Sequence, residues 1–204
     1  YLVLNLVVVM GGRVIPAFTG NALPRAKVIR RPMLDRAAIG LTLAAFAADV
    51  AGAPGWLIAP FAAAAAIAHA VRLADWNPLA TRGKPILWIL HLSYAWFPLA
   101  FLLLALGALG MVSASAATHA FAAGEMGGVI VGMITRTALG HTGSPLSAGR
   151  AETAAYVMVH LACVVRVAAA LLPGFANVEM LGAAGLLWAG AFLLYAISYA
   201  PRLW

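Results

Sequence analysis

The feature that most constrains this 204-residue chain is a series of seven apolar runs, each close to the length that crosses a lipid bilayer. The runs cover residues 1–18, 37–52, 55–74, 85–107, 115–138, 152–172 and 179–200. Only 9% of the residues are charged, against about 25% in a soluble domain, which excludes a soluble enzyme. We expect an all-α fold, a polytopic transmembrane helix bundle of about seven spans that forms a single domain over residues 1–204. The second run is the weakest, because it is short and holds Asp49.

Basic residues lie in alternate connections between the runs, and this pattern predicts the orientation of the chain. Lys and Arg favour the cytoplasmic side when loops are short. The residues on the basic side are Arg25, Lys27, Arg30, Arg31, Arg36, Arg72, Arg82, Lys84, Arg136, Arg150 and Arg202. We therefore expect residue 1 in the periplasm and the C-terminus in the cytoplasm. This orientation accounts for the net charge of +7. We therefore expect the lipid bilayer as a partner of the chain, and we expect no nucleic acid partner.

Two further arginines lie within apolar runs. Arg13, near the inner end of the first run, can extend its side chain to the cytoplasmic interface. Arg166 lies well inside the sixth run, where a charge costs about 2.5 to 3.5 kcal/mol on insertion scales. Arg166 therefore needs a partner or an anionic cofactor.

Five histidines form the main candidate site. His69 and His91 lie at similar depth near the inner ends of the third and fourth runs, and the two can face one another. The other candidates are His119 on the level of Arg166 and near Glu125, His160 near the membrane middle, and His141 beyond the inner end of the fifth run. Imidazole ligates both haem and copper, and an arginine suits haem propionates. A histidine at a helix end also often only hydrogen-bonds a carbonyl, so each of them has a structural alternative.

The fifth run also carries small residues at a spacing of four. Gly124, Gly128, Gly132 and Gly140 follow this spacing, with Arg136 in the same series. Such a ridge lets another helix approach closely, so we expect this face to pack against a neighbouring span. No CxxC, HExxH, GxSxG or phosphate-binding glycine loop occurs in the sequence, so hydrolase, zinc and nucleotide functions have no support.

Three stretches together resemble the NnrS family: GGRVIPAFTG at 11–20, ILWILHLSYAW at 86–96, and THAFAAGEMGGVIVGMITRTALGHTGSPL at 118–146. The third stretch is the most specific. The resemblance covers nearly the whole chain and corresponds to the C-terminal part of a family pattern of about twelve spans. It implies that this chain is part of a longer protein, completed by N-terminal helices or by a homo-oligomer.

The resemblance implies a bacterial inner-membrane protein that contains haem and copper and responds to nitric oxide and nitrosative stress, often beside denitrification. Nitric oxide is then the expected ligand, and a metal-dependent redox activity toward it stays open. The metal-ligand candidates carried over are His91, His119 and His141. The candidates for cofactor binding are Arg13, Arg136 and Arg166, which match basic positions of the family pattern, and His69 and His160, which match none of its histidines.

Two other functions fit the residues. A transporter or permease would use Arg166, Glu125 and the histidines to line a substrate or proton path. A membrane scaffold would use the same polar residues only to specify helix pairing. The regular glycine spacing of the fifth run argues against the broken helices that transporters use.

Overall fold

The protein is described here by a computed structural model that covers residues 1–172, 174 and 177–203, with the side chains of all these except 177, 202 and 203. Over these residues the fold is helical. The helices are α1 (Leu2–Ala22), α2 (Pro32–Val50), α3 (Gly55–Asp75), the short 3-10 helix η1 (Pro78–Thr81), α4 (Pro85–Tyr94), α5 (Trp96–Ala108), α6 (Ala114–His119), the π-helical segment η2 (Ala120–Met126), α7 (Gly127–His141), α8 (Arg150–Leu171) and α9 (Asn177–Leu203).

Six helical segments are long and apolar enough to cross a membrane, which confirms the expected transmembrane helix bundle. They are Leu2–Ala22, Gly55–Asp75, Pro85–Ala108, Ala114–His141, Arg150–Leu171 and Val178–Pro201. The weak second run also forms a helix, α2, which has 19 residues but carries Asp35, Arg36 and Asp49. This helix begins at Pro32, five residues before the expected start, because proline suits the first helical turn and Asp35 complements its positive end.

Two of the crossings are not regular α-helices. When α2 is counted as the second crossing, the fourth crossing is Pro85–Ala108. It is interrupted at Ala95, between α4 and α5. Pro98 lies three residues later and has no N–H to offer the carbonyl of Tyr94, so one helical hydrogen bond is missing at this point. The fifth crossing runs through α6, the π-helical η2 and α7. Both irregular segments lie in the interior of the bundle, where η2 packs against α5 and α8.

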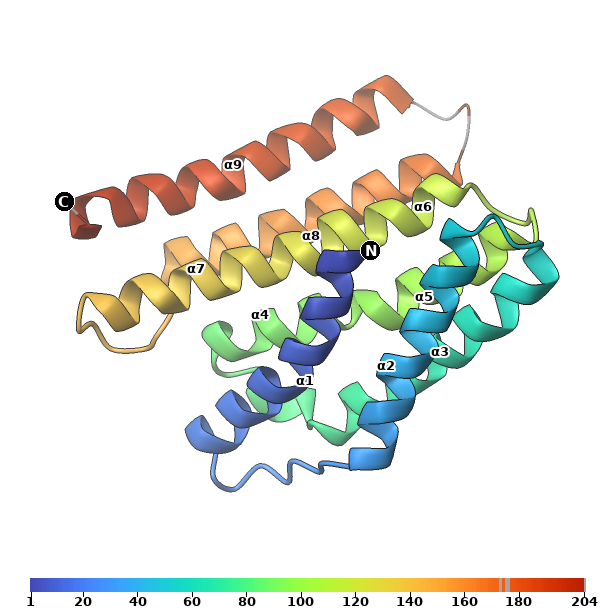
Figure 1. Cartoon of the computed structure of the whole chain (residues 1–204). Helices are drawn as coiled ribbons and strands as arrows, with labels where there is room; N and C mark the ends of the chain where they lie inside the picture. Colours follow the sequence, from blue (N-terminus) through green and yellow to red (C-terminus); the bar gives the residue numbers. More distant parts are fainter. Residues whose placement is uncertain (173, 175–176, 204) are drawn as a thin grey trace.

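The helices form one bundle in which α9 has the most peripheral position. Figure 1 shows α6 and α7 end to end along one line, with α8 and α9 running beside them and the hairpin of α2 and α3 on the other side of the bundle. The α9 helix packs on α8 and, less extensively, on α7. Only 11% of the most apolar 18-residue stretch of α9 is buried. Most of the surface of α9 therefore faces the surroundings of the bundle.

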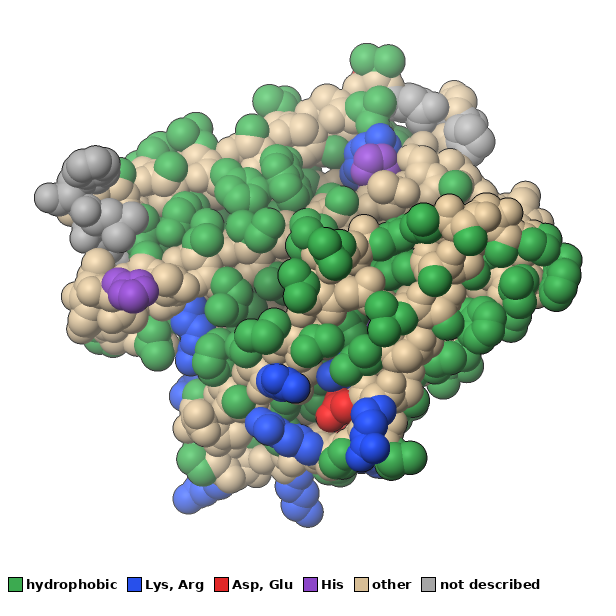
Figure 2. Space-filling view, viewed as in Figure 1, with side chains coloured by type: hydrophobic (Ala, Val, Ile, Leu, Met, Phe, Trp, Pro, Cys, Tyr) green, Lys and Arg blue, Asp and Glu red, His purple; other side chains and the backbone are tan. Residues whose placement is uncertain are grey.

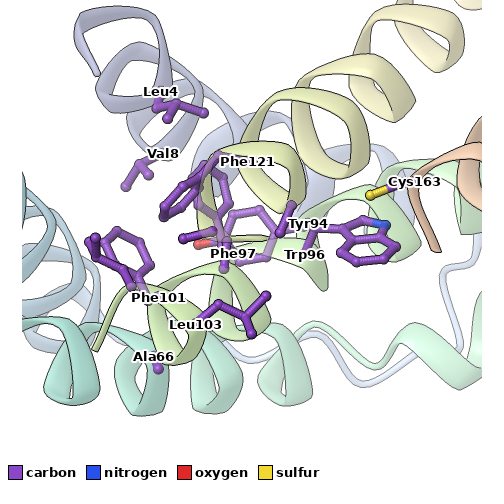
Figure 3. Close-up of a cluster of buried hydrophobic side chains, with 14 of the residues drawn as sticks. Leu4, Val8, Ala66, Tyr94, Trp96, Phe97, Phe101, Leu103, Phe121 and Cys163 are labelled. Carbon is purple, nitrogen blue, oxygen red and sulfur yellow. The ribbon is translucent and has the colours of Figure 1, made fainter. Parts of the chain in front are cut away.

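Aromatic side chains fill the centre of the bundle between α2, α5 and η2. The ring of Phe101 lies 5.2 Å from that of Phe46 and 5.0 Å from that of Phe121, measured between centroids. Figure 3 shows Phe97, Phe101, Phe121 and Tyr94 gathered beside Val8 of α1. This apolar centre surrounds the buried polar residues described below.

The basic residues gather at one end of the bundle, as the alternating pattern predicts. Figure 2 shows most of the Lys and Arg side chains on this face together at the end where the chain passes from α1 to α2, below a broad apolar surface. The expectation that Arg72 belongs to a basic connection is wrong. Arg72 lies within α3 and is only 3% exposed, because its guanidinium finds partners inside the bundle. The side chain of Arg202 lies outside the described part of the chain.

Candidate functional site

His91 is the predicted metal ligand whose surroundings are closest to those of a ligating histidine. It lies in α4 and is 3% exposed. Its Nε2 lies 2.8 Å from Thr19 Oγ1 of α1. Its Nδ1 is also buried and has no hydrogen-bonding partner among the described residues. One ring nitrogen of His91 is therefore engaged and the other is free.

The hydroxyl of Thr19 determines which nitrogen of His91 carries the proton. Thr19 Oγ1 donates its only hydrogen to the carbonyl of Ile15, 2.9 Å away, so toward His91 it can only accept. Nε2 of His91 is then the N–H donor, and in a neutral imidazole Nδ1 keeps its lone pair. A histidine that binds a metal through one nitrogen usually donates the other N–H to a fixed acceptor. The contact with Thr19 thus leaves the lone pair of His91 Nδ1 without a partner.

His91 also lines a pocket of about 470 Å³ at the end of the bundle where α3 connects to α4. This volume lies within the usual range for small-molecule sites. The other lining residues are Leu73, Pro78, Leu79, Thr81, Arg82, Trp88, Leu92 and Ala95. The walls are thus mainly apolar, with the guanidinium of Arg82 as the single charged group among them. Such a pocket suits an apolar ligand that carries an anionic group.

His69 has a different environment, because both of its ring nitrogens are engaged. Its Nδ1 lies 2.6 Å from the hydroxyl of Tyr94, and its Nε2 lies 2.9 Å from Thr42 Oγ1. The hydrogen bonds of His69 therefore go to Tyr94, one turn after His91, rather than to His91. They join α2, α3 and α4, and they leave no free nitrogen on His69 for a ligand.

Arg72 extends this polar network toward the basic end of the bundle. Its Nε pairs with Asp35 at 2.6 Å, and its Nη1 donates to the Val8 carbonyl at 3.1 Å and to the Tyr94 hydroxyl at 2.9 Å. Gly12 makes room for this guanidinium, because a Cβ at that position would overlap the terminal nitrogens of Arg72. The network fixes α1, α2, α3 and α4 relative to one another. It lies next to the aromatic centre, where Tyr94 contacts Phe97.

His160 also has one unpartnered nitrogen, but its proton lies on the other side of the ring. Nε1 of Trp96 donates to Nδ1 of His160 at 3.0 Å, so Nδ1 is the acceptor. Nε2 of the neutral ring is then an N–H group, and it is buried without a partner among the described residues. Gly128 packs against this ring, since a Cβ there would lie 2.7 Å from Cε1. His160 thus offers a proton donor rather than a lone pair.

Burial of the Glu125 side chain costs free energy that no hydrogen bond among the described residues offsets. Glu125 lies in η2, is fully buried, and neither carboxyl oxygen has a hydrogen-bonding partner within the described structure. Its carboxyl group is close enough to Tyr94 to interact with it electrostatically. Intramembrane carboxyl groups are rare and mark functional positions, and π-helical segments often occur at such positions.

His119 and His141 lie at opposite ends of the fifth crossing. At about 1.5 Å per residue they are roughly 33 Å apart along the helix axis. His119 is partly exposed beside Arg166, as expected, whereas His141 is exposed at the end of α7. Figure 2 shows histidine at two widely separated places on the surface. Among the residues that the structure describes, no three His, Cys, Asp or Glu side chains lie together as a metal site would require.

The three arginine candidates lie apart from one another. Arg13 is exposed on α1. The guanidinium of Arg136 lies 3.7 Å from the ring centroid of Phe18, a cation–π contact. Arg166 lines a pocket of about 240 Å³ that also involves Trp188 of α9.

The glycine ridge packs against the fourth crossing, as its spacing predicts. A Cβ added at Gly124, Gly128 or Gly132 would meet, in that order, Trp96, Ser93 and Leu90. Gly140 has open space around it and takes no part. The ridge therefore brings Glu125 and His160 close to α4 and α5.

Sequence reasoning did not find the partners of these histidines. Thr19, Trp96 and Tyr94 are ordinary membrane residues by type, and nothing in their spacing indicates a hydrogen bond to a histidine. The one available signal was the arrangement of Gly11 and Gly12 in the first run, which permits a close approach to α1 but does not say what approaches.

Comparison with known proteins assigns the chain to a family. The family model described as NnrS protein matches residues 1–204, the whole chain. No curated protein and no solved structure matches it. Since the family model spans the full length, the chain belongs to the NnrS family.

Proposed function

We propose that this chain is the haem-binding part of a bacterial inner-membrane protein that binds nitric oxide in the response to nitrosative stress. The observation that carries the proposal is the state of His91, whose Nε2–H is bonded to Thr19 and whose buried Nδ1 is free. Membership of the NnrS family supports a role in the nitric oxide response. The proposed orientation has residue 1 in the periplasm and the basic end in the cytoplasm.

Haem needs only one protein nitrogen as an axial ligand, and His91 can supply it. In this role Nδ1 of His91 would hold the iron, and Thr19 would keep the ring in the required tautomer and orientation. Arg82, in the wall of the same pocket, would pair with a propionate. When bound, haem would supply the iron that takes nitric oxide.

The residues around His91 also set the polarity of the site. Trp76 presents its ring to His91 with a centroid distance of 6.4 Å and an interplanar angle of 73°. Leu73, Trp88 and Leu92 line the pocket. These side chains would exclude water from the ligand and favour a small neutral molecule such as nitric oxide.

Copper, the second metal that the resemblance implies, fits this chain less well. Such sites use several imidazole or sulfur donors. His119 and His141 are far apart, and His69 has no free nitrogen. A copper site at His119 or His141 would therefore need donors from another part of the protein or from a second copy.

The test is the absorption spectrum of the purified protein, reduced and oxidised, with and without nitric oxide. We expect a haem Soret band that shifts on addition of nitric oxide, and we expect His91→Ala to lose most of the haem. His141→Ala removes an exposed imidazole without touching the pocket and serves as the matched control. Haem retained at the wild-type level in His91→Ala, or lost equally in His141→Ala, would refute the assignment of His91.

A transporter remains the second candidate, and two observations favour it. The fifth crossing contains a π-helical segment, and this segment holds the unpartnered carboxyl group of Glu125. Irregular backbone at membrane depth with a buried ionisable side chain is typical of ion-coupled transport. Two results together would favour this alternative. The purified protein would contain no haem, and Glu125→Gln would abolish the resistance of cells to nitrosative stress that the protein confers.

A further inference from the structure

One face of α8 carries a buried series of protonatable side chains that the haem proposal does not use. Glu152, Tyr156 and His160 follow one another at intervals of four residues. This interval places them on the same side of a helix. Their exposures are 8%, 0% and 7%, so all three face the interior of the bundle. Glu152 also caps the start of α8 through the Gly149 N–H, whereas packing alone would place apolar residues at positions 156 and 160.

The series begins at the basic end of the bundle. Glu152 lies in the first turn of α8, beside the exposed Arg150. One of its carboxyl oxygens accepts from the Tyr199 hydroxyl at 3.0 Å, and the other accepts from the backbone N–H of Gly149 at 2.9 Å. Glu152 is thus a fixed carboxyl group close to the aqueous surface.

The middle of the series is formed by groups that lack partners. The hydroxyl of Tyr156 is buried and makes no hydrogen bond of good geometry with the residues that the structure covers, although Thr135 lies close enough to interact with it. Trp88 packs edge-on against its ring, and Thr135, Arg136 and Tyr195 are the other polar groups near it. Next comes Nε2 of His160, an N–H donor without an acceptor. A buried polar group left unpaired costs free energy, so a packing role does not explain them.

The series ends against the crossing that holds Glu125. The ring of His160 lies against Gly128, and Glu125 precedes Gly128 by three residues on the same crossing. Three residues correspond to roughly 4.5 Å along a helix axis. Both carboxyl oxygens of Glu125 are unpartnered. An ionised carboxylate in this environment would be far too costly, so Glu125 carries a proton.

We propose that Glu152, Tyr156 and His160 form a proton route from the basic end of the bundle to Glu125 in the membrane interior. Successive members are about 6 Å apart along α8, which exceeds one hydrogen bond, so bound water completes each step. Glu125 releases its proton to a water held by the Nε2–H of His160, which stays neutral; this water passes a proton to the Tyr156 oxygen as the Tyr156 hydroxyl proton moves on to Glu152, and Glu152 releases one proton to the aqueous side. The reverse sequence protonates Glu125 again. No electron moves and no bond other than O–H or N–H changes. The route does not depend on haem.

Hydrogen–deuterium exchange of the Glu125 carboxyl group, followed by infrared spectroscopy on the purified protein in phospholipid, tests the route. The band of a protonated carboxyl group that disappears in Glu125→Gln reports this proton. After transfer from H₂O to D₂O we expect it to shift about tenfold more slowly in Tyr156→Phe than in the wild type, since one hydrogen-bonding step is lost. Glu152→Gln keeps an acceptor for Tyr199 and should slow the shift as well.

Tyr195→Phe is the matched control, because it removes one hydroxyl from a nearby tyrosine that bonds the Ile134 carbonyl outside the series. It should leave the rate unchanged, and backbone amide exchange should be the same in all variants. An equal rate in the wild type, Tyr156→Phe and Glu152→Gln would overturn the route. So would equal slowing in Tyr195→Phe, or a carboxyl band that survives Glu125→Gln. If Tyr156→Phe does not fold, Glu152→Gln decides. The haem spectrum is measured separately, so the two proposals can fail independently.

Discussion

Substitution of Gly12 by alanine should destabilise the protein through a residue on another helix. A Cβ at position 12 would overlap the guanidinium of Arg72. Arg72 has little freedom to yield, because it is held by Asp35, by the Val8 carbonyl and by the Tyr94 hydroxyl. The added methyl group must therefore displace the guanidinium or separate α1 from α3.

The size of the effect follows from the contacts that are lost. Hydrogen bonds from a charged group contribute about 1.5 to 3 kcal/mol each, and breaking a buried ion pair costs about 3 to 5 kcal/mol. Displacement of Arg72 from Val8 and Tyr94, with Asp35 kept, removes two such hydrogen bonds and gives an expected loss of about 3 to 6 kcal/mol. By the scaling of about 2 to 4 °C per kcal/mol for proteins of this size, Tm should fall by roughly 6 °C or more.

The assay is thermal unfolding of the purified protein in detergent, with Gly20→Ala as control. Gly20 lies in the same helix and has no atom within 4 Å of an added Cβ. Alanine there should be neutral or should stabilise by up to about 1 kcal/mol through helix propensity. The same Gly12→Ala change is also measured in an Arg72→Ala background, where the overlap is removed and most of the cost should disappear.

Two results would refute this reasoning. Equal Tm values for Gly12→Ala and Gly20→Ala would mean that the close approach of Arg72 to α1 is not needed for stability. An undiminished cost in the Arg72→Ala background would mean that Gly12 acts through some other contact.

Three further predictions concern the site and the orientation of the chain. Thr19→Val, which removes the acceptor for Nε2 of His91, should weaken haem binding by about 10- to 100-fold in a spectral titration, and unchanged affinity would argue against the role of Thr19. Gly128→Ala should lower the free energy of unfolding by about 1 to 3 kcal/mol, because its Cβ would overlap Ser93 Oγ, whereas Gly140→Ala should have little effect on Tm. An impermeant maleimide added outside intact cells should label Ser113→Cys but not Gly83→Cys, and the reverse pattern would show that the chain has the opposite orientation.

The helix bundle and the order of its long apolar helices could be predicted from the sequence, because each span must supply its own apolar length. Of the seven expected spans, six are long and apolar enough to cross a membrane, and the second, α2, is not among these six. The glycine ridge was also predictable, since small residues at a spacing of four leave a groove whatever the partner helix is. The boundaries of α2 were less accurate. Its start depends on Pro32 and Asp35, which lie outside the apolar run.

The state of the histidines could not be predicted, because it depends on contacts between segments far apart in the chain. His69 and His91 occupy similar positions near the ends of their runs, yet one has both nitrogens engaged and the other has a free Nδ1. The difference comes from Thr42, Tyr94 and Thr19, which reach the rings only after four helices have packed. Arg72 was misread for the same reason, since its position at the end of a run is typical of an interface residue.

The pair formed by Asp35 and Arg72 has a consequence for the biogenesis of the protein. Neither residue is well suited to leave the translocon alone within its own helix, because an unpaired charge is disfavoured in hydrocarbon. The two helices are joined by the short connection 51–54, so α2 and α3 can enter the bilayer together as a hairpin with the pair already formed. On this basis α2 becomes a transmembrane segment only in the company of α3, and a ribosome stalled between the two would leave α2 outside the hydrocarbon core.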